Sequence, residues 1–413
     1  MAAEDKYVTL YKPNISIVLP NDTLDIDLAD IVSISFIHNY DTMTYPIIRV
    51  RLYSDISVIQ TICDNPDDIE VRGNLAGMIY RMNDNDKSPV MVSYAKEVAF
   101  RLKGYIENKN IPSSKFDQYE FGIKKTTDMN SNVKVPIEIY CYNDALVHLM
   151  KQKSPSIYKN MSLTSIISDI LNRNSIYDFD MDTLTNQTRY DQVLIPNLNI
   201  LQTLGFFDEN YGLYRKGAQV YGDIDKLHIC NTDVVNGTDS IPIYVEATKN
   251  NSDMSGMRMI DKTFQMTTMA GNVSVKTETD IERVLNSKYL AAIDVSSMHV
   301  TTEELTELYA TTSGYAKLKN IEVPDILHKS DSEYVAASYV ARLNESITEV
   351  DVSGVGFDIS RIAVNSRFNL VFATPIRGLN INKRYRPTYA CHVLSNLDSN
   401  LFIAQTTMNL RTN

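Results

Sequence analysis

The chain has 413 residues, of which 44% are hydrophobic and 22% are charged. This balance is typical of a folded protein and excludes a largely disordered chain. At about 150 residues per domain, the length predicts two or three domains. Lys and Arg total 40 against 51 Asp and Glu, and the net charge of −11 disfavours a protein that grips nucleic-acid phosphates.

The chain ends and the cysteines exclude further classes. The first residues are polar and acidic, and no apolar run approaches the ~20 residues that span a bilayer. We therefore expect no secretory signal and no membrane insertion. The four cysteines (Cys63, Cys141, Cys230 and Cys391) are scattered, and apolar residues flank them. We expect reduced structural thiols in a protein made in a cytoplasm, because metal and redox sites need closely spaced pairs.

The first third of the chain has the pattern of β-structure. In 46–53 the arginines Arg49 and Arg51 alternate with the apolar residues Ile48, Val50 and Leu52, as in a strand with one buried face. Turn-rich spacers separate similar segments. The expected strands are 14–19, 31–37, 46–53, 68–72, 77–81, 90–93, 99–106, 118–124 and 136–142. Many short strands at this spacing predict a barrel or sandwich.

The middle of the chain changes to helical periodicity. We expect a short helix over 144–153, with Asn143 as its cap. Ser162 can cap a second helix, whose apolar residues fall at i, i+3, i+4, i+7 and i+8 between Leu163 and Leu171. A third helix follows Pro196, and Gly212 ends it. With strands expected at 213–220 and 226–230, this segment reads as a small α+β unit.

The β pattern returns in the C-terminal third. The expected strands are 241–247, 257–268, 272–276, 349–354, 368–374, 387–395 and 402–409. Capping boxes at Thr301–Glu304 and at Ser330–Glu333 predict two helices between them, the second over 332–347. The order β, α+β, β predicts a mainly β fold, with a first β-barrel at 1–143, an α+β insert at 144–240 and a second β-barrel at 241–413. The last of these carries a helical insertion around 286–330.

The sequence contains no pattern of residues that carries catalysis. The six histidines (His38, His148, His228, His299, His328 and His392) share no metal-ligand spacing, and no phosphate-binding glycine loop or nucleophile motif occurs. The acidic clusters 64–70 and 178–182 lack the glycine and glutamate of a calcium loop, so we interpret them as solvated loops. We predict no catalytic residue, no metal ligand, no cofactor and no enzymatic activity.

One basic cluster stands against the acidic total. Arg377, Lys383, Arg384 and Arg386 lie within a single loop, 377–386. Three interpretations stay open. The loop is an exposed hairpin with solubilising charge, or it docks on an acidic partner surface, since Arg pairs well with carboxylates. The third interpretation is nucleic-acid binding.

Several segments together resemble a known family. Val135–Tyr142 runs into the helix 144–153 and then into the Ser-Leu-x-x-Ile helix 162–171, and near the C-terminus the helix 332–347 leads into the strand 348–354. The segments 368–372 and 389–396 continue the pattern. This order resembles the central baseplate hub of contractile-tailed bacteriophages and the related part of type VI secretion spike proteins. At 194–199 the sequence lacks the Gln-Tyr-x-Glu-Ser string of the secretion spikes, which favours a phage hub.

The resemblance covers residues 14–410 and implies a structural role in the virion. It implies two tail-tube-like antiparallel β-barrels in each subunit and a homotrimer whose six barrels adapt a six-fold tail tube to a three-fold central spike. Baseplate wedge or tape-measure proteins would be neighbours. DNA would pass through the lumen without specific binding, and the subunit would assemble in the host bacterial cytoplasm. Two alternatives stay open, a tail-tip receptor-binding component and a tail-associated cell-wall hydrolase.

Overall fold

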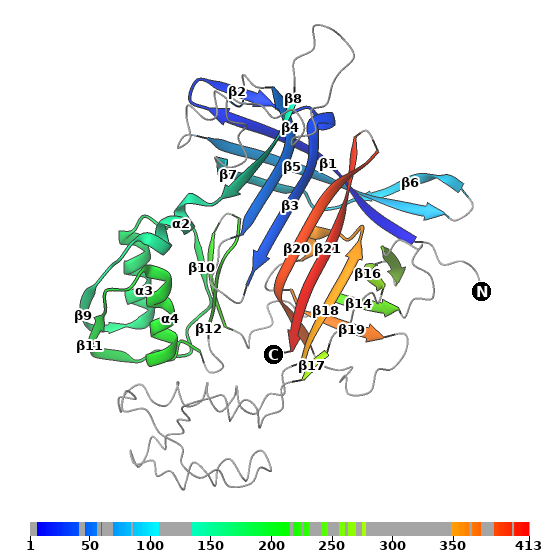
Figure 1. Cartoon of the computed structure of the whole chain (residues 1–413). Helices are drawn as coiled ribbons and strands as arrows, with labels where there is room; N and C mark the ends of the chain where they lie inside the picture. The colour runs from blue at the N-terminus through cyan, green and yellow to red at the C-terminus, as the bar shows by residue number, and fades with distance from the viewer. Residues whose placement is uncertain are drawn as a thin grey trace.

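The structure is a computed structural model. The described residues are 6–40, 46–55, 59, 69–83, 86–106, 134–214, 218–224, 226–231, 241–246, 256–260, 263–269, 275–277, 348–362, 366–372, 384–398 and 400–412. Figure 1 shows a large twisted sheet with a smaller helical unit beside it. The expected mainly β fold with an α+β insert is confirmed.

One 16-stranded sheet runs through both ends of the chain. Its strands are β1 (Lys6–Leu19), β2 (Asp22–Asp25), β3 (Ile31–Asn39), β4 (Ile47–Asp55), β5 (Glu70–Asn83), β6 (Asp86–Tyr94), β7 (Val98–Ile106), β8 (Lys134–Tyr142), β14 (Ile241–Glu246), β15 (Met257–Ile260), β16 (Thr263–Met269), β17 (Val275–Thr277), β18 (Thr348–Val355), β19 (Phe368–Phe372), β20 (Arg384–Asp398) and β21 (Leu401–Thr412). Most neighbours are antiparallel. β14 is parallel to both β16 and β19, so the sheet is mixed.

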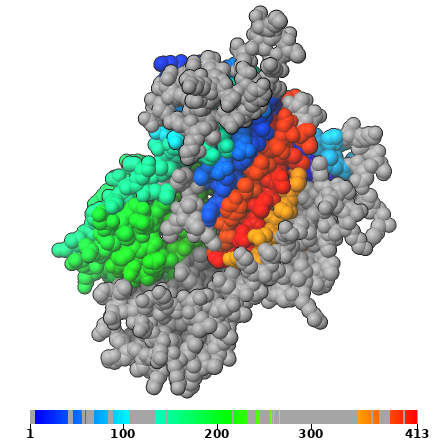
Figure 2. All heavy atoms as spheres, in the orientation of Figure 1, coloured from blue at the N-terminus to red at the C-terminus, as the bar shows by residue number. Residues whose placement is uncertain are grey.

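The N-terminal and C-terminal strands are joined by backbone pairing. β3 pairs with β20 from Ser33↔Ser395 to Asn39↔Tyr389, and β1 pairs with β21 at Leu10↔Ile403. Figure 2 shows β3, β20, β21 and β18 side by side on one face of the molecule. The two β parts of the sequence therefore share one sheet.

The middle segment forms the insert, with its own small sheets. Its elements are α2 (Asp144–Lys151), β9 (Ser156–Ser162), α3 (Leu163–Arg173), β10 (Phe179–Met181), β11 (Arg189–Ile195), α4 (Ile200–Asn210), β12 (Ala218–Gly222) and β13 (Leu227–Asn231). β9 pairs with β11, and β13 lies between β10 and β12.

The two longer helices of the insert begin and end where the sequence predicts. The Ser162 side chain accepts a hydrogen bond from Ser165 N, and Asn174 ends α3. α4 starts with a capping box between Asn199 and Gln202, and Gly212 follows it at φ +70°. Each cap satisfies backbone groups that the helix end leaves unpaired, so these boundaries are fixed locally.

The buried apolar residues form three main cores. The first is built by strands β1, β3, β4, β5, β7 and β8, and residues of the C-terminal third (Ile359, Leu394, Phe402 and Ala404) complete it. The second belongs to the insert. The third lies under the C-terminal strands but includes Tyr40 from the end of β3 and Tyr221 and Cys230 from the insert. The third core therefore holds all three parts of the chain together.

Several strand boundaries differ from the expectations. The segments expected at 68–72 and 77–81 belong, in their described part, to the single strand β5, which pairs with β1 without interruption. Gly73 lies within this strand opposite Phe100, and a Cβ at Gly73 would sit 2.1 Å from the Phe100 ring. That glycine marks a close packing contact and no turn. The segment 257–268 is wrong as one strand, since β15 and β16 form an antiparallel hairpin. The strand at 118–124, both helices at 301–304 and 332–347, and the insertion at 286–330 lie outside the described residues.

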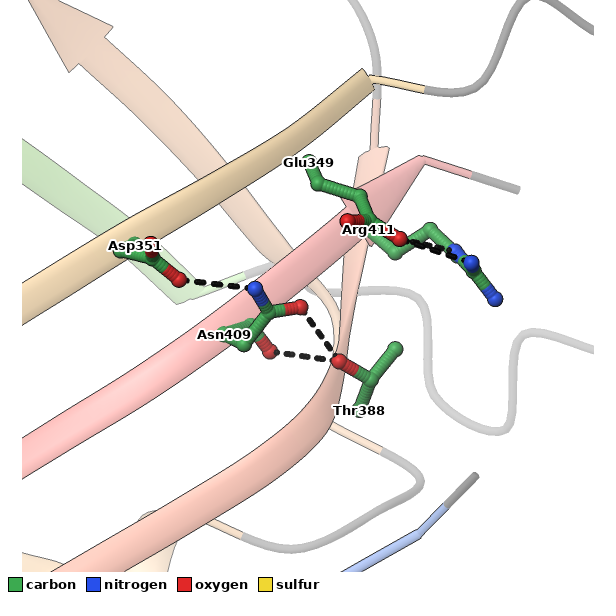
Figure 3. Close-up of polar contacts among 5 residues, drawn as sticks. All are labelled: Glu349, Asp351, Thr388, Asn409 and Arg411. Carbon is green, nitrogen blue, oxygen red and sulfur yellow. Dashed lines mark hydrogen bonds and ion pairs between the residues drawn. The ribbon is translucent and has the colours of Figure 1, made fainter. Parts of the chain in front are cut away.

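A polar cluster fixes the register of three C-terminal strands (Figure 3). Thr388 lies at a bulge of β20, where the pairing with β21 shifts by one residue. Its Oγ1 donates to Asn409 Oδ1 at 2.5 Å, and Asn409 Nδ2 donates to Asp351 Oδ1 of β18 at 2.7 Å. Beside it, Arg411 Nη2 lies 2.7 Å from Glu349 Oε1. One asparagine on β21 thus connects the two strands that flank it.

We expect the substitution Asn409→Ala to lower the free energy of unfolding by about 1–3 kcal/mol, because it removes two hydrogen bonds at a half-buried position. The measurement is urea unfolding followed by circular dichroism. Arg411→Ala is the matched control, since its ion pair is part-exposed and should contribute no more than about 1 kcal/mol. Equal losses in the two variants would contradict the assignment.

Candidate functional site

The structure describes two of the four residues of the basic cluster that the sequence predicts. Arg384 and Arg386 begin β20, with Arg384 exposed and Arg386 half-buried, whereas Arg377 and Lys383 lie outside the described residues. The fold brings a further arginine to them, the buried Arg367. Burial lowers the pKa of Arg367, and the charges of Arg386 and Arg384 lower it further. Sequence reasoning missed Arg367 because it stands alone in the chain.

The described residues hold no group of three His, Cys, Asp or Glu side chains that could bind a metal ion. His148 is exposed on α2, and His228 stacks on Tyr221 with 4.8 Å between the ring centroids. Cys141 and Cys230 are buried free thiols, as expected, and Cys391 is half-buried. Burial raises the pKa of the Cys141 thiol far above its ordinary value, which makes it unreactive.

His38 and His392 come together although they are far apart in sequence, with ring centroids 6.1 Å apart. The pairing of β3 with β20 places them side by side. No spacing in the sequence could have indicated this contact.

The most prominent surface feature is a projecting hairpin made of the second half of β5 and all of β6. β5 pairs with β1 along its whole length, and its other edge carries β7 over its first half and β6 over its second. Among the described strands, β6 pairs with β5 alone and ends the sheet. In Figure 1 this hairpin extends away from the rest of the sheet. We call residues 86–94 the arm.

The arm exposes apolar side chains on both of its faces. Val90, Met91 and Val92 are 48%, 42% and 41% exposed, and Tyr94 is 71% exposed. Successive residues of a strand point to opposite faces, so neither face of the arm is covered by the described chain. Another chain can add as a strand at a free edge that carries exposed apolar residues. The unpaired backbone groups of the edge can hydrogen-bond to that chain, and the apolar side chains can pack against it.

A second apolar patch lies on the insert. Ile157 of β9 and Leu194 of β11 are directly opposite each other in the register, and they are 59% and 57% exposed. Figure 1 places this two-stranded sheet on the other side of the molecule from the arm. Two apolar surfaces on opposite sides of one subunit are what a head-to-tail association of copies requires.

No helix among the described residues is long and apolar enough to cross a membrane. The arm and the insert patch give the described structure an open strand edge and two exposed apolar surfaces. Within the described residues it offers no cluster of metal ligands.

Comparisons with known proteins give a family match over most of the chain. Residues 8–389 match the family described as Bacteriophage PBS1 gene 109 protein. A comparison with curated proteins finds no match.

Solved structures with a similar course of the chain include tail proteins and a type VI secretion component. A tail protein from Neisseria meningitidis MC58 is 9% identical with a TM-score of 0.49, and the alignment covers 97% of each chain. The 43 kDa tail protein of prophage MuSo2 from Shewanella oneidensis is 9% identical with a TM-score of 0.43, covering 96% of this chain and 97% of that one. An E. coli component of the type VI secretion system is 10% identical with a TM-score of 0.42, covering 92% and 73%.

We expect the double substitution Val90→Lys and Val92→Lys to reduce binding of the dye 8-anilinonaphthalene-1-sulfonate several-fold. Both side chains are about half-exposed, so the unfolding midpoint should stay unchanged. Dye fluorescence and thermal unfolding measure the two effects. Val32→Lys, at a valine of β3 that is 42% exposed and lies outside the arm, is the control and should leave dye binding at the wild-type level. Unchanged binding in the arm variant would show that the arm is not the apolar surface that the dye reports.

Proposed function

The chain belongs to the Bacteriophage PBS1 gene 109 protein family, and on that premise we propose that it is a structural subunit of a phage tail baseplate. The proposal follows from three properties: the phage family, the order of elements that resembles a baseplate hub, and a surface suited to assembly. The role is structural, and no catalytic step is assigned to any residue.

The finer proposal is a homotrimeric ring. The observation that carries it is the pairing of β3 with β20 and of β1 with β21, which joins the strands around the first and third cores into one wall. Through this joint a subunit holds its two β units in a fixed relative position. Three subunits would then present six β units in a ring, which would adapt a six-fold tail tube to a three-fold central spike.

The arm is the proposed contact between subunits. Its free edge can accept the backbone of a neighbouring copy, and its valines can pack against that copy's apolar surface. Ring closure requires such a heterologous contact, in which different surfaces of two identical subunits meet. The proposed further partners in the virion are the tail tube protein, the central spike protein, and baseplate wedge or tape-measure proteins.

The net negative charge of the chain suggests a property of the channel that such a ring would enclose. A net charge of −11 favours a lumen that repels DNA, so that the genome slides past without being held. The domain limits 1–143, 144–240 and 241–413 remain part of this proposal.

We expect the purified full-length chain to have a mass three times its 46.8 kDa in multi-angle light scattering. The arm variant Val90→Lys/Val92→Lys should be monomeric at the same concentration, because two buried ammonium groups without partners oppose the contact. Val32→Lys is the control and should remain trimeric. A wild-type chain that stays monomeric at every concentration and with spike protein present would refute the trimer, whereas a trimeric arm variant would refute only the contact.

We expect Arg384→Glu to reduce incorporation of the chain into tails at least several-fold while its unfolding midpoint is unchanged, because Arg384 is exposed at the start of β20. The measurement is a complementation assay with immunodetection in purified particles. Arg189→Glu, which reverses an exposed arginine on the insert, is the matched control. Wild-type incorporation of the Arg384 variant would identify Arg384 as solvated surface and remove it from the proposed partner contact.

A further inference from the structure

A continuous run of five rings crosses the joint between the two ends of the chain and the insert. It begins at His392 of β20, continues through His38 of β3 and Tyr40 at its end, and reaches Tyr221 of β12 and His228 of β13. Successive ring centroids are 6.1, 5.6, 5.5 and 4.8 Å apart. None of the five side chains is more than 8% exposed. We call this run the ring ladder.

A cavity of about 370 Å³ opens at the histidine end of the ladder. Its walls come from β3, the residues around the start of β7, the turn between β12 and β13, the short helix η3 (Ile359–Arg361), and β20. The insert reaches the cavity through Asp223 and Ile224. All three parts of the chain therefore meet at this cavity, and a change there alters how the insert is held.

Both histidines leave a buried ring nitrogen unsatisfied in the described structure. His38 Nδ1 and His392 Nε2 have no hydrogen-bond partner, whereas His392 Nδ1 lies 3.0 Å from Thr406 Oγ1. A buried polar atom without a partner carries a desolvation cost that structures rarely tolerate without a reason. These two atoms are the places where a proton can be added in the joint.

The charged groups around His38 and His392 would not neutralise a positive charge on each of the two rings. Besides each other, the histidines share the cavity with Lys96 and Glu97 before β7 and with Asp223 of the insert turn. Burial, and after it the neighbouring His38, lower the pKa of His392 to about 3. Burial also lowers the pKa of His38, against the opposing effect of Asp223. Both imidazoles are therefore neutral in the closed joint at pH 7.

The other end of the ladder differs. His228 Nδ1 lies 3.7 Å from Asp180 Oδ2, and Lys226 Nζ lies 2.6 Å from the same carboxylate oxygen. A proton on His228 would have a counter-charge beside it, so the acid response is assigned to His38 and His392.

We propose that His38 and His392 form an acid latch, which holds the insert turn against the two β parts at neutral pH and releases it on acidification. In the open state water reaches both rings, and each takes its ordinary pKa of about 6.5. Since the open state then binds more protons than the closed one, closure is stable above about pH 6.5 and is progressively lost as the pH falls below it. Each histidine raises the opening constant by up to about tenfold per pH unit.

The test measures opening through a thiol that the joint buries. Cys230 of β13 packs in the third core with Tyr40 and Tyr221, whereas Cys141 is buried in the first core. The full-length chain is labelled with 4,4′-dithiodipyridine between pH 7.5 and 4.5, and each cysteine is followed by peptide mass spectrometry. Rates are corrected with a free cysteine peptide at the same pH. We expect labelling of Cys230 to rise at least tenfold from pH 6.5 to 5, while Cys141 stays protected.

The variant His38→Phe/His392→Asn removes both titrating rings. Phenylalanine keeps a ring against Tyr40, and asparagine keeps a polar atom for Thr406, so the variant should fold and its Cys230 labelling should be independent of pH. His148→Asn, at an exposed histidine of α2, is the matched control and should respond like the wild type. A wild-type Cys230 rate that does not change with pH, or a rise that persists in the double variant, would overturn the latch. A parallel rise at Cys141 would identify global unfolding instead and would equally overturn it.

Discussion

The structure depends on the backbone pairing between β3 and β20. Seven residue pairs join a strand from the beginning of the chain to one from its end, and they run from Ser33↔Ser395 to Asn39↔Tyr389. The bulge at Thr388 lies just beyond this ladder, where its carbonyl accepts a hydrogen bond from Tyr40 N at 2.8 Å. This short stretch fixes the position of the first core relative to the third. Through Tyr40 it also fixes where the insert attaches.

The insert is held mainly by side chains, which makes its attachment a different kind of contact. Gln219 Nε2 donates to the Tyr40 carbonyl at 3.1 Å, and the rings of Tyr40 and Tyr221 meet edge to face. Side-chain contacts can change when a nearby group is protonated, whereas the backbone hydrogen bonds between paired strands change little. The chain thus combines a stiff, continuously paired sheet with a unit whose attachment can be adjusted.

Sequence patterns predicted what is decided locally and missed what is decided by distant contacts. The cap at Ser162 and the apolar stripe after it predicted α3, and the limits at Pro196 and Gly212 predicted α4, because a helix satisfies its own backbone groups. β9 and β11 have mostly exposed or half-buried residues and no alternation, so they carried no strand signal. The apolar residues of the arm look like those of a buried strand, and only the fold reveals their exposure. The meeting of His38 with His392 needed the register of β3 and β20.

The pairing of early with late strands has a consequence for synthesis. β21 pairs with β18, β20 and β1, so the sheet beside β1 is completed only after residues 401–412 have been made. Contacts of such long sequence separation form late in folding. A chain that stops short of residue 401 leaves β1 and β20 with unpaired edges and the first core without Phe402 and Ala404. We expect such a truncated chain to fail to fold, which would keep it out of any assembly of these subunits.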